Sequence, residues 1–235
     1  MAAKSKLAVN ASLITDNKKD AFWRVCHTDS QGVSTTKVIS QETFVNLLKA
    51  NTIVRKESTK NRLGKMPYGY VDCLYGKPDE YTIAVCYPAK KRGVVYYNDT
   101  YFVPNPNLLF IFKINNGIVA EKRCFAVKTT EITATTPLYQ FPFGNVSEAW
   151  GSMCYGNIKL PSCIDFSTID ELVQLFLNGQ VNDDLYRKEF TTKNCKQFEL
   201  LKFLSNKKSF PEKILKEATY IGKPLLFEQV FLEKK

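Results

Sequence analysis

Apolar and polar residues alternate in two short segments near the N-terminus, and such alternation is typical of half-buried β-strands. The two segments are residues 6–14 and 21–27. Residues 41–50 instead carry apolar side chains at helical spacing, and residues 55–70 are charged and contain glycine and proline. We therefore predict a strand–strand–helix extension over residues 1–65, which ends in a linker or flexible loop.

The next part of the chain is rich in valine, isoleucine, tyrosine and phenylalanine, which favour β-strands. Four strands are predicted there, at residues 80–87, 92–97, 108–114 and 121–128. The Asn-Asn-Gly sequence at residues 115–117, between the last two strands, is a hairpin signal. Because the connections are too short for helical crossovers, the pattern predicts an antiparallel meander.

Apolar residues show no regular spacing over residues 129–166, which combine prolines and glycines with many aromatic side chains. This composition is too apolar for a disordered segment. An irregular stretch of nearly 40 residues is uncommon inside a compact domain, and such stretches are usually either functional or disordered. We therefore look for the chemistry of the chain in this segment.

A helix is predicted directly after the irregular stretch, because apolar residues recur there at helical spacing. Its apolar face is formed by Ile169, Leu172, Val173 and Phe176. Thr168 and Glu171 have the spacing of a capping box, and Gly179 stands where a helix would end. Two more helices are predicted, at residues 195–205 and 211–219. The predicted fold class is therefore α+β.

The chain is basic, with 33 lysines and arginines against 23 acidic residues and a net charge of +10. The excess lies in residues 1–70 and 191–235, whereas the middle of the chain is nearly neutral. A basic surface attracts nucleic acid or acidic proteins, but no pattern of a known nucleic-acid-binding module accompanies it. Weak nucleic-acid contact through the basic flanks and simple solubility both remain open.

Several classes of function lack support in the sequence. The single histidine, His27, excludes a zinc site that needs two histidines, and there is no glycine-rich nucleotide-binding motif. The seven cysteines form no CxxC pair, and the N-terminus lacks the apolar stretch of a secretory signal. No segment is apolar over the length that a membrane helix needs. We therefore expect a cytoplasmic protein with reduced thiols, no membrane partner, no metal and no cofactor.

The candidate chemistry lies in residues 142–161 and centres on Cys154. Gly151 and Gly156 flank this cysteine, which favours an exposed turn that a second polypeptide can approach closely. Asn145 lies nine residues earlier, and its amide could donate to an oxyanion on a carbonyl bonded to the sulfur. Glu148 is the nearest acidic candidate for a base. The alternatives are a buried structural cysteine and an asparagine that only forms a turn.

The residues around Cys154 resemble those of known proteins. Gly151-Ser152-Met153-Cys154 is similar to the Gly-x-Ile-Cys sequence of ubiquitin-conjugating enzymes, and Phe143-Gly144-Asn145 stands at their His-Pro-Asn tripeptide. A closer resemblance, over about residues 1–190, is to the PRTRC system protein B family, which is grouped with prokaryotic relatives of ubiquitin-conjugating enzymes (family D). It is carried by Tyr87-Pro88-Ala89, Pro104–Phe110, Thr136–Tyr139, Pro142–Val146, Gly151–Gly156 and Pro161.

This resemblance implies a fold and an activity. The fold would be the ubiquitin-conjugating-enzyme fold over residues 66–190, an antiparallel meander sheet with flanking helices. The N-terminal extension would precede it, and residues 191–235 would form a basic helical segment packed on it. Cys154, with Asn145 beside it, would accept the C-terminus of a ubiquitin-like protein as a thioester from a ThiF-like adenylating partner. The protein would then be a transferase.

The sequence departs from the ubiquitin-conjugating pattern at the tripeptide. Phe143 replaces its histidine and Gly144 replaces its proline. This departure favours an alternative, in which the chain is a non-catalytic docking subunit for the same partners. A third possibility is a basic, nucleic-acid-associated protein of plasmid maintenance.

Overall fold

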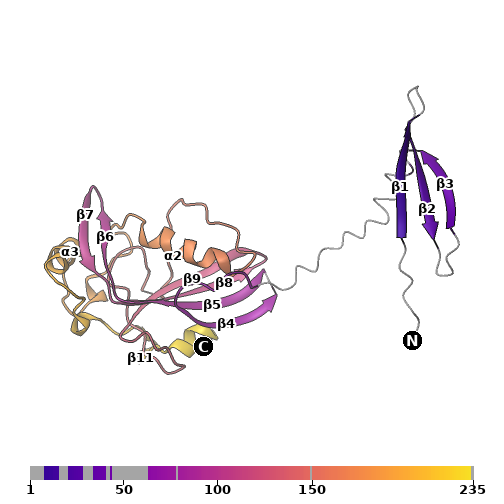
Figure 1. Ribbon diagram of the computed structural model, residues 1–235. Helices are drawn as coiled ribbons and strands as arrows, with labels where there is room; N and C mark the ends of the chain where they lie inside the picture. The colour runs from indigo at the N-terminus through magenta and orange to yellow at the C-terminus, as the bar shows by residue number, and fades with distance from the viewer. Residues whose placement is uncertain are drawn as a thin grey trace. The chain divides into compact units, whose positions relative to one another are not determined.

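The computed structural model describes residues 8–15, 21–28, 34–40, 43, 63–77, 79–148 and 150–233 (Figure 1). The chain divides into two compact units, Met1–Lys60 and Asn61–Lys235.

The N-terminal unit contains a three-stranded antiparallel sheet in the order β1-β2-β3. The strands are β1 (Ala8–Thr15), β2 (Ala21–Thr28) and β3 (Ser34–Ser40). The first two match the predicted strands, whereas β3 was not predicted although its threonines, valine and isoleucine favour a strand. The helix predicted at residues 41–50 lies outside the described residues, apart from Thr43.

The C-terminal unit is built on a four-stranded antiparallel sheet in the order β4-β5-β8-β9. Its strands are β4 (Tyr70–Lys77), β5 (Glu80–Tyr87), β8 (Asn107–Asn115) and β9 (Ile118–Val127). Strands β6 (Lys91–Tyr96) and β7 (Asp99–Pro104) form a separate hairpin between β5 and β8. The predicted run of neighbouring strands is therefore interrupted by this hairpin, and β4 and β7 were not predicted.

Strand β8 occupies the centre of the sheet because it is apolar on both faces, as a fully buried strand must be. Phe110 and Phe112 belong to one hydrophobic cluster, together with helix α2 (Ile169–Leu177). Leu109 and Ile111 point to the opposite face and belong to a second cluster, with the C-terminal residues of the chain. The sheet is thus covered on both sides.

Helix α2 buries the four residues of its predicted apolar face. Its start differs from the prediction, because the Thr168 side chain makes no capping hydrogen bond. Asp165 caps instead, accepting a hydrogen bond from the Ser167 backbone N–H at 2.8 Å, so that a 3-10 turn η1 (Phe166–Thr168) precedes the helix. The helix ends at Leu177, whose carbonyl accepts a hydrogen bond from Arg92. This cation is favourably placed at a helix C-terminus.

The C-terminal segment contains the 3-10 turn η2 (Lys188–Phe190) and helix α3 (Gln197–Ser205), close to the helix predicted at residues 195–205. The helix predicted at residues 211–219 is wrong, because only the turn η3 (Glu212–Ile214) is helical there. The rest of that segment is extended, and Ala218 donates to the carbonyl of Leu138 at 2.9 Å. Backbone groups of residues 138–140 need partners, and this pairing supplies them.

The chain ends with a short hairpin and a short helix that cover the second face of the sheet. Strands β10 (Thr219–Tyr220) and β11 (Lys223–Pro224) form the hairpin, and α4 (Phe227–Phe231) follows. Phe227, Val230 and Phe231 are buried in the cluster with Leu109 and Ile111. These last residues therefore contribute to the core of this unit.

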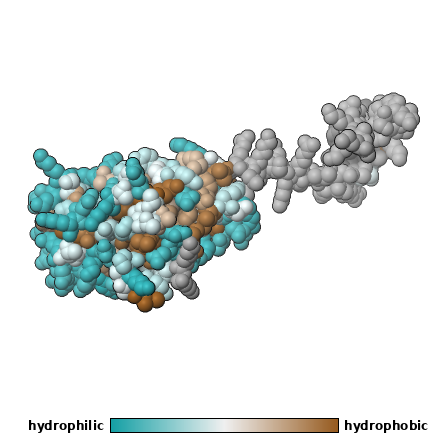
Figure 2. Space-filling model, turned by 90° about the horizontal axis from the view of Figure 1, so that it is seen from below, coloured by the Kyte–Doolittle hydropathy of each residue, from teal (hydrophilic) through white to brown (hydrophobic). Residues whose placement is uncertain are grey.

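Apolar side chains also reach the surface of the C-terminal unit, where Figure 2 shows them scattered among polar ones. The most exposed are Phe102, Ile118, Ile164 and Ile221. No helix in the described part of the chain is long and apolar enough to cross a membrane.

Candidate functional site

A small backbone ladder presents Cys154. Val146 pairs with Met153 in an antiparallel bridge, and Ser152 pairs in the same way with Arg123 of β9. The Met153 N–H donates to the carbonyl of Lys122 at 3.0 Å, and the Cys154 N–H donates to the carbonyl of Asn145 at 2.8 Å. The irregular stretch is therefore attached to the sheet edge just before the cysteine.

Alternation along this extended segment brings the thiol to the surface. Met153 and Tyr155 are buried, and the Tyr155 hydroxyl donates to the carbonyl of Leu172 in α2 at 2.9 Å. Because successive side chains of an extended chain point in opposite directions, Cys154 between them points outward and is exposed. The backbone N–H of Gly156 donates to the Cys154 sulfur at 3.4 Å.

The turn that precedes Cys154 requires glycine at position 151. Gly151 has a φ of 63°, in the left-handed region. A Cβ atom there would lie 2.7 Å from the Phe125 ring and 2.8 Å from the carbonyl oxygen of Cys124. The sequence predicted a turn here because glycine adopts positive φ angles. The close packing on β9 is a second reason why position 151 must be glycine.

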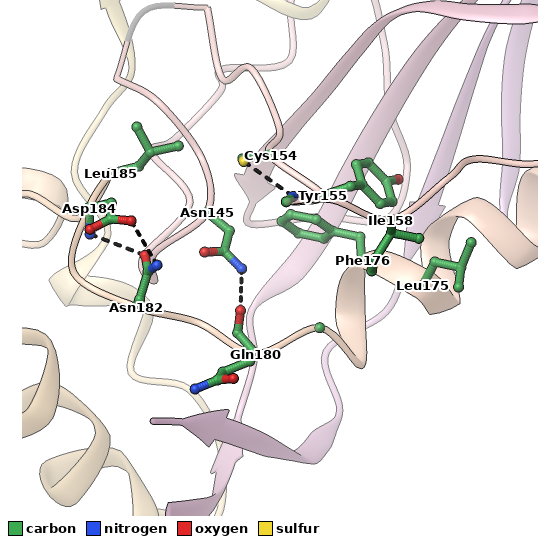
Figure 3. Close-up of a pocket in the computed structure, with 12 residues that line it drawn as sticks. Asn145, Cys154, Tyr155, Ile158, Leu175, Phe176, Gln180, Asn182, Asp184 and Leu185 are labelled. Carbon is green, nitrogen blue, oxygen red and sulfur yellow. Dashed lines mark hydrogen bonds between the residues drawn. The ribbon is translucent and has the colours of Figure 1, made fainter. Parts of the chain in front are cut away.

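Cys154 lies at a cavity of about 330 Å³ (Figure 3). Asn145 and Cys154 line one part of it, the end of α2 lines another, and the loop after α2 lines a third. Besides Asn145 and Cys154, the lining residues are Tyr155, Gly156, Ile158, Leu175, Phe176, Gly179, Gln180, Asn182, Asp184 and Leu185. The cavity thus combines a surface thiol with apolar, amide and carboxylate side chains.

Asn145 is brought next to Cys154 through the backbone, while its side chain is engaged elsewhere. Its φ is 69°, a left-handed conformation that asparagine tolerates better than most residues. Its amide nitrogen donates to the carbonyl of Gln180 at 2.7 Å, and Figure 3 shows the amide directed to Gln180 rather than to the sulfur. Only one of the two amide hydrogens is needed for this bond.

The chain was compared with known protein families, curated proteins and solved structures. The model of prokaryotic E2 family D matches residues 34–218. The chain belongs to prokaryotic E2 family D. Neither the curated proteins nor the solved structures gave a match. Family D membership links the chain to ubiquitin-like conjugation and its machinery, and it agrees with the mixed sheet-and-helix fold.

An aromatic side chain two positions before Asn145 lies in the core. Phe143 is fully buried, and its ring packs edge-on against Phe141 at 5.5 Å between centroids. It supports the loop that carries Asn145 by apolar packing. Aromatic pairs of this geometry contribute about 0.5–1.5 kcal/mol beyond the area that they bury.

A carboxylate that lines the Cys154 cavity was missed by sequence reasoning. Asp184 lines the Cys154 cavity, although it is 30 residues downstream in the chain. Its carboxylate accepts a hydrogen bond from the Asn182 amide at 2.8 Å, which orients it. Glu148, the nearest acidic residue in sequence, instead lines a separate cavity with Trp150 and Tyr220. The Asn-Asp-Asp sequence at residues 182–184 signals only a turn.

The other described cysteines differ from Cys154 in their environment. Burial raises the pKa of the Cys86 thiol to about 11, and burial together with Asp72 raises the pKa of Cys73 to about 11. Cys124 is fully buried, and its pKa lies well above the ordinary value because its thiolate would be desolvated. Burial also raises the pKa of Cys163 and Cys195. The side chain of Cys26 lies outside the described residues.

No three His, Cys, Asp or Glu side chains gather as a metal site in the described part of the chain. The side chains that line the Cys154 cavity carry three kinds of polar group. These are the thiol of Cys154, the side-chain amides of Asn145, Gln180 and Asn182, and the carboxylate of Asp184.

Proposed function

We propose that this protein carries a ubiquitin-like protein as a thioester on Cys154 and passes it to an amine. The observation that carries the proposal is an exposed cysteine at a cavity that also holds Asn145 and Asp184, in a chain of the E2 family. Within prokaryotic E2 family D, we assign the chain to PRTRC system protein B. The partners would be a ThiF-like adenylating enzyme and a small ubiquitin-like protein, and the compartment would be the cytoplasm.

Charging would be a thioester exchange. The Cys154 sulfur attacks the C-terminal carbonyl of the modifier, which the adenylating enzyme holds as a thioester. A new carbon–sulfur bond forms, the old one breaks, and the thiol proton of Cys154 passes to the departing thiolate of the enzyme. The outward direction of the sulfur favours this attack, because a second protein can reach it.

Discharge would use the other residues of the cavity. The amine attacks the thioester carbonyl, a carbon–nitrogen bond forms, and the Cys154 thiolate leaves. The second hydrogen of the Asn145 amide is available to the oxyanion that develops on the carbonyl. The Asp184 carboxylate, which lines the same cavity, would accept the proton that the amine loses, and the proton would then return to the sulfur.

The decisive experiment combines the protein with the adenylating enzyme, the ubiquitin-like protein and ATP. We expect an adduct on a non-reducing gel that disappears on reduction and is absent in Cys154→Ala. Cys154→Ser should give an adduct that resists reduction, since an oxyester replaces the thioester. Cys73→Ala, at a half-buried cysteine elsewhere in the sheet, is the matched control and should charge normally. An adduct that persists in Cys154→Ala would reject the assignment.

A non-catalytic docking subunit is the second candidate. Two observations favour it, namely the buried Phe143 in place of a polar histidine and the engagement of the Asn145 amide with Gln180. In this case the partners bind, but Cys154 forms no thioester. Co-purification of the three proteins without an ATP-dependent adduct would select this function over the first.

A further inference from the structure

Gln197, the first residue of α3, is a buried polar side chain that does not line the Cys154 cavity but bonds to two loops that carry lining residues. It is only 1% exposed. Its side-chain oxygen accepts a hydrogen bond from the backbone N–H of Gly144. Its side-chain nitrogen donates to the carbonyl of Asn182 at 2.9 Å and to the carboxylate of Asp183 at 3.2 Å.

These partners lie next to the two polar groups of the cavity. Gly144 immediately precedes Asn145, and Asn182 and Asp183 immediately precede Asp184. One amide side chain therefore joins the loop that carries the oxyanion donor to the loop that carries the carboxylate. Asn145 adds a second link between the same loops through the carbonyl of Gln180.

The side-chain amide of glutamine has the donors and the acceptor that this arrangement needs. A glutamate at position 197 would keep the acceptor for Gly144 but would face the Asn182 carbonyl and the Asp183 carboxylate with a negative charge. An apolar residue would leave the Gly144 N–H and the Asn182 carbonyl without this partner, and unpaired buried polar groups are costly. The residue type is thus explained by its contacts.

The residue type at position 144 is also explained by its contacts. A Cβ atom on Gly144 would overlap the carbonyl oxygen of Asn182, so the two loops approach closely only because this side chain is absent. A proline at position 144 would also lack the N–H that Gln197 accepts. The departure of Gly144 from the tripeptide proline is therefore coupled to the contact with α3.

We propose that Gln197 is a positioning residue that sets the spacing of Asn145 and Asp184 across the Cys154 cavity. The effect of Gln197 on transfer rests on the proposed function, whereas the hydrogen bonds by which Gln197 joins the two loops do not. Misplacement of catalytic groups by about 1 Å can lower a rate by about 100-fold, so a residue that fixes two loops can control transfer without contacting the substrate.

The test compares Gln197→Met and Gln197→Glu with the matched control Gln229→Met. Gln229 also accepts a backbone hydrogen bond, from Leu226 at 2.9 Å, but it lies in α4. Charging of Cys154, discharge to free lysine and hydrogen exchange of the Gly144 amide are measured for each variant. Because Gln197→Met removes all three bonds and Gln197→Glu keeps one acceptor, the pair remains informative if one variant folds poorly.

We expect both Gln197 variants to charge within about twofold of wild type, because the sulfur is held by the β9 ladder and not by α3. Discharge should fall by about tenfold or more in kcat. The Gly144 amide should exchange at least tenfold faster in Gln197→Met, with little change in Gln229→Met.

Two results would overturn the proposal. Wild-type discharge together with wild-type protection of Gly144 would show that Gln197 does not hold the loops. An equal loss of charging and discharge, in proportion to lost stability, would show a purely structural role. If wild type itself never charges, the proposed function fails, but the exchange of the Gly144 amide still decides whether Gln197 joins the loops.

Discussion

At the scale of single residues, the contrast between Cys154 and the other described cysteines governs reactivity. Only the thiolate form of a cysteine is nucleophilic, so a thiol with a raised pKa is inert at neutral pH. Cys86, with a pKa of about 11, is also buried in the sheet. Burial and the raised pKa therefore both make Cys86 unreactive, whereas Cys154 is exposed.

We predict that iodoacetamide at pH 8 modifies Cys154 well before Cys86. With a pKa of about 11, only about one Cys86 in a thousand is ionised at pH 8. This fraction rises tenfold per pH unit up to about pH 11, so the Cys86 rate should rise with pH. Peptide mass spectrometry of native protein measures both rates. Equal labelling of the two cysteines at pH 8 would contradict the predicted exposure.

Two substitutions of Asn145 separate its backbone role from its amide. Asn145→Gly and Asn145→Ala both remove the amide, so discharge from Cys154 should fall to a similar level in both. Asn145→Ala should be less stable by about 1 kcal/mol, because alanine at a φ of 69° is strained and glycine is not. Thermal unfolding measures the difference. Unequal discharge rates that follow stability would assign Asn145 a structural role alone.

At the scale of elements, the short ladder of residues 145–154 on β9 determines where the thiol lies. Its geometry depends on one close approach between the turn and the strand, at Gly151 and Phe125. Gly156, on the other side of Cys154, has a similar positive φ of 59°, but a Cβ there would meet no atom within 4 Å. The two glycines thus form a natural pair for comparison.

Gly151→Ala should destabilise the protein by about 2–4 kcal/mol, since backbone strain and overlap with β9 add. Gly156→Ala carries only the strain and should cost about 1 kcal/mol. Chemical denaturation of both variants measures the free energies of unfolding. A Gly151→Ala variant as stable as Gly156→Ala would show that the ladder does not pack on β9 as described.

At the scale of the whole molecule, the last residues of the chain complete the core of the C-terminal unit. Leu200, Leu201 and Leu204 of α3 are buried in the cluster that contains α2. Phe227 and Phe231 of α4 cover the opposite face of the sheet. The basic C-terminal segment therefore contributes to the apolar clusters on both faces of the sheet.

Removal of residues 216–235 should expose the face of the sheet that contains Leu109, Ile111 and Phe125. A large apolar surface of this kind favours aggregation or a loosely packed state. We expect the truncated protein to bind the dye ANS and to lose its cooperative thermal transition. A soluble truncated protein with a wild-type transition would show that α4 does not cover the core.

The sequence by itself determined the features that depend on near neighbours. The strands β5, β8 and β9, the apolar face of α2 and the turn around Cys154 all follow from periodicity or from glycine, which act within a few residues. The family resemblance carried by ordered motifs agreed with membership of prokaryotic E2 family D.

Only the tertiary structure decided the features that depend on distant residues. The pairing of β5 with β8, the extended path of residues 215–220 and the meeting of Asp184 and Gln197 with the Asn145 loop have no local signal. Their physical reason is that buried backbone and amide groups must find hydrogen-bond partners, and folding alone determines which distant groups come within reach.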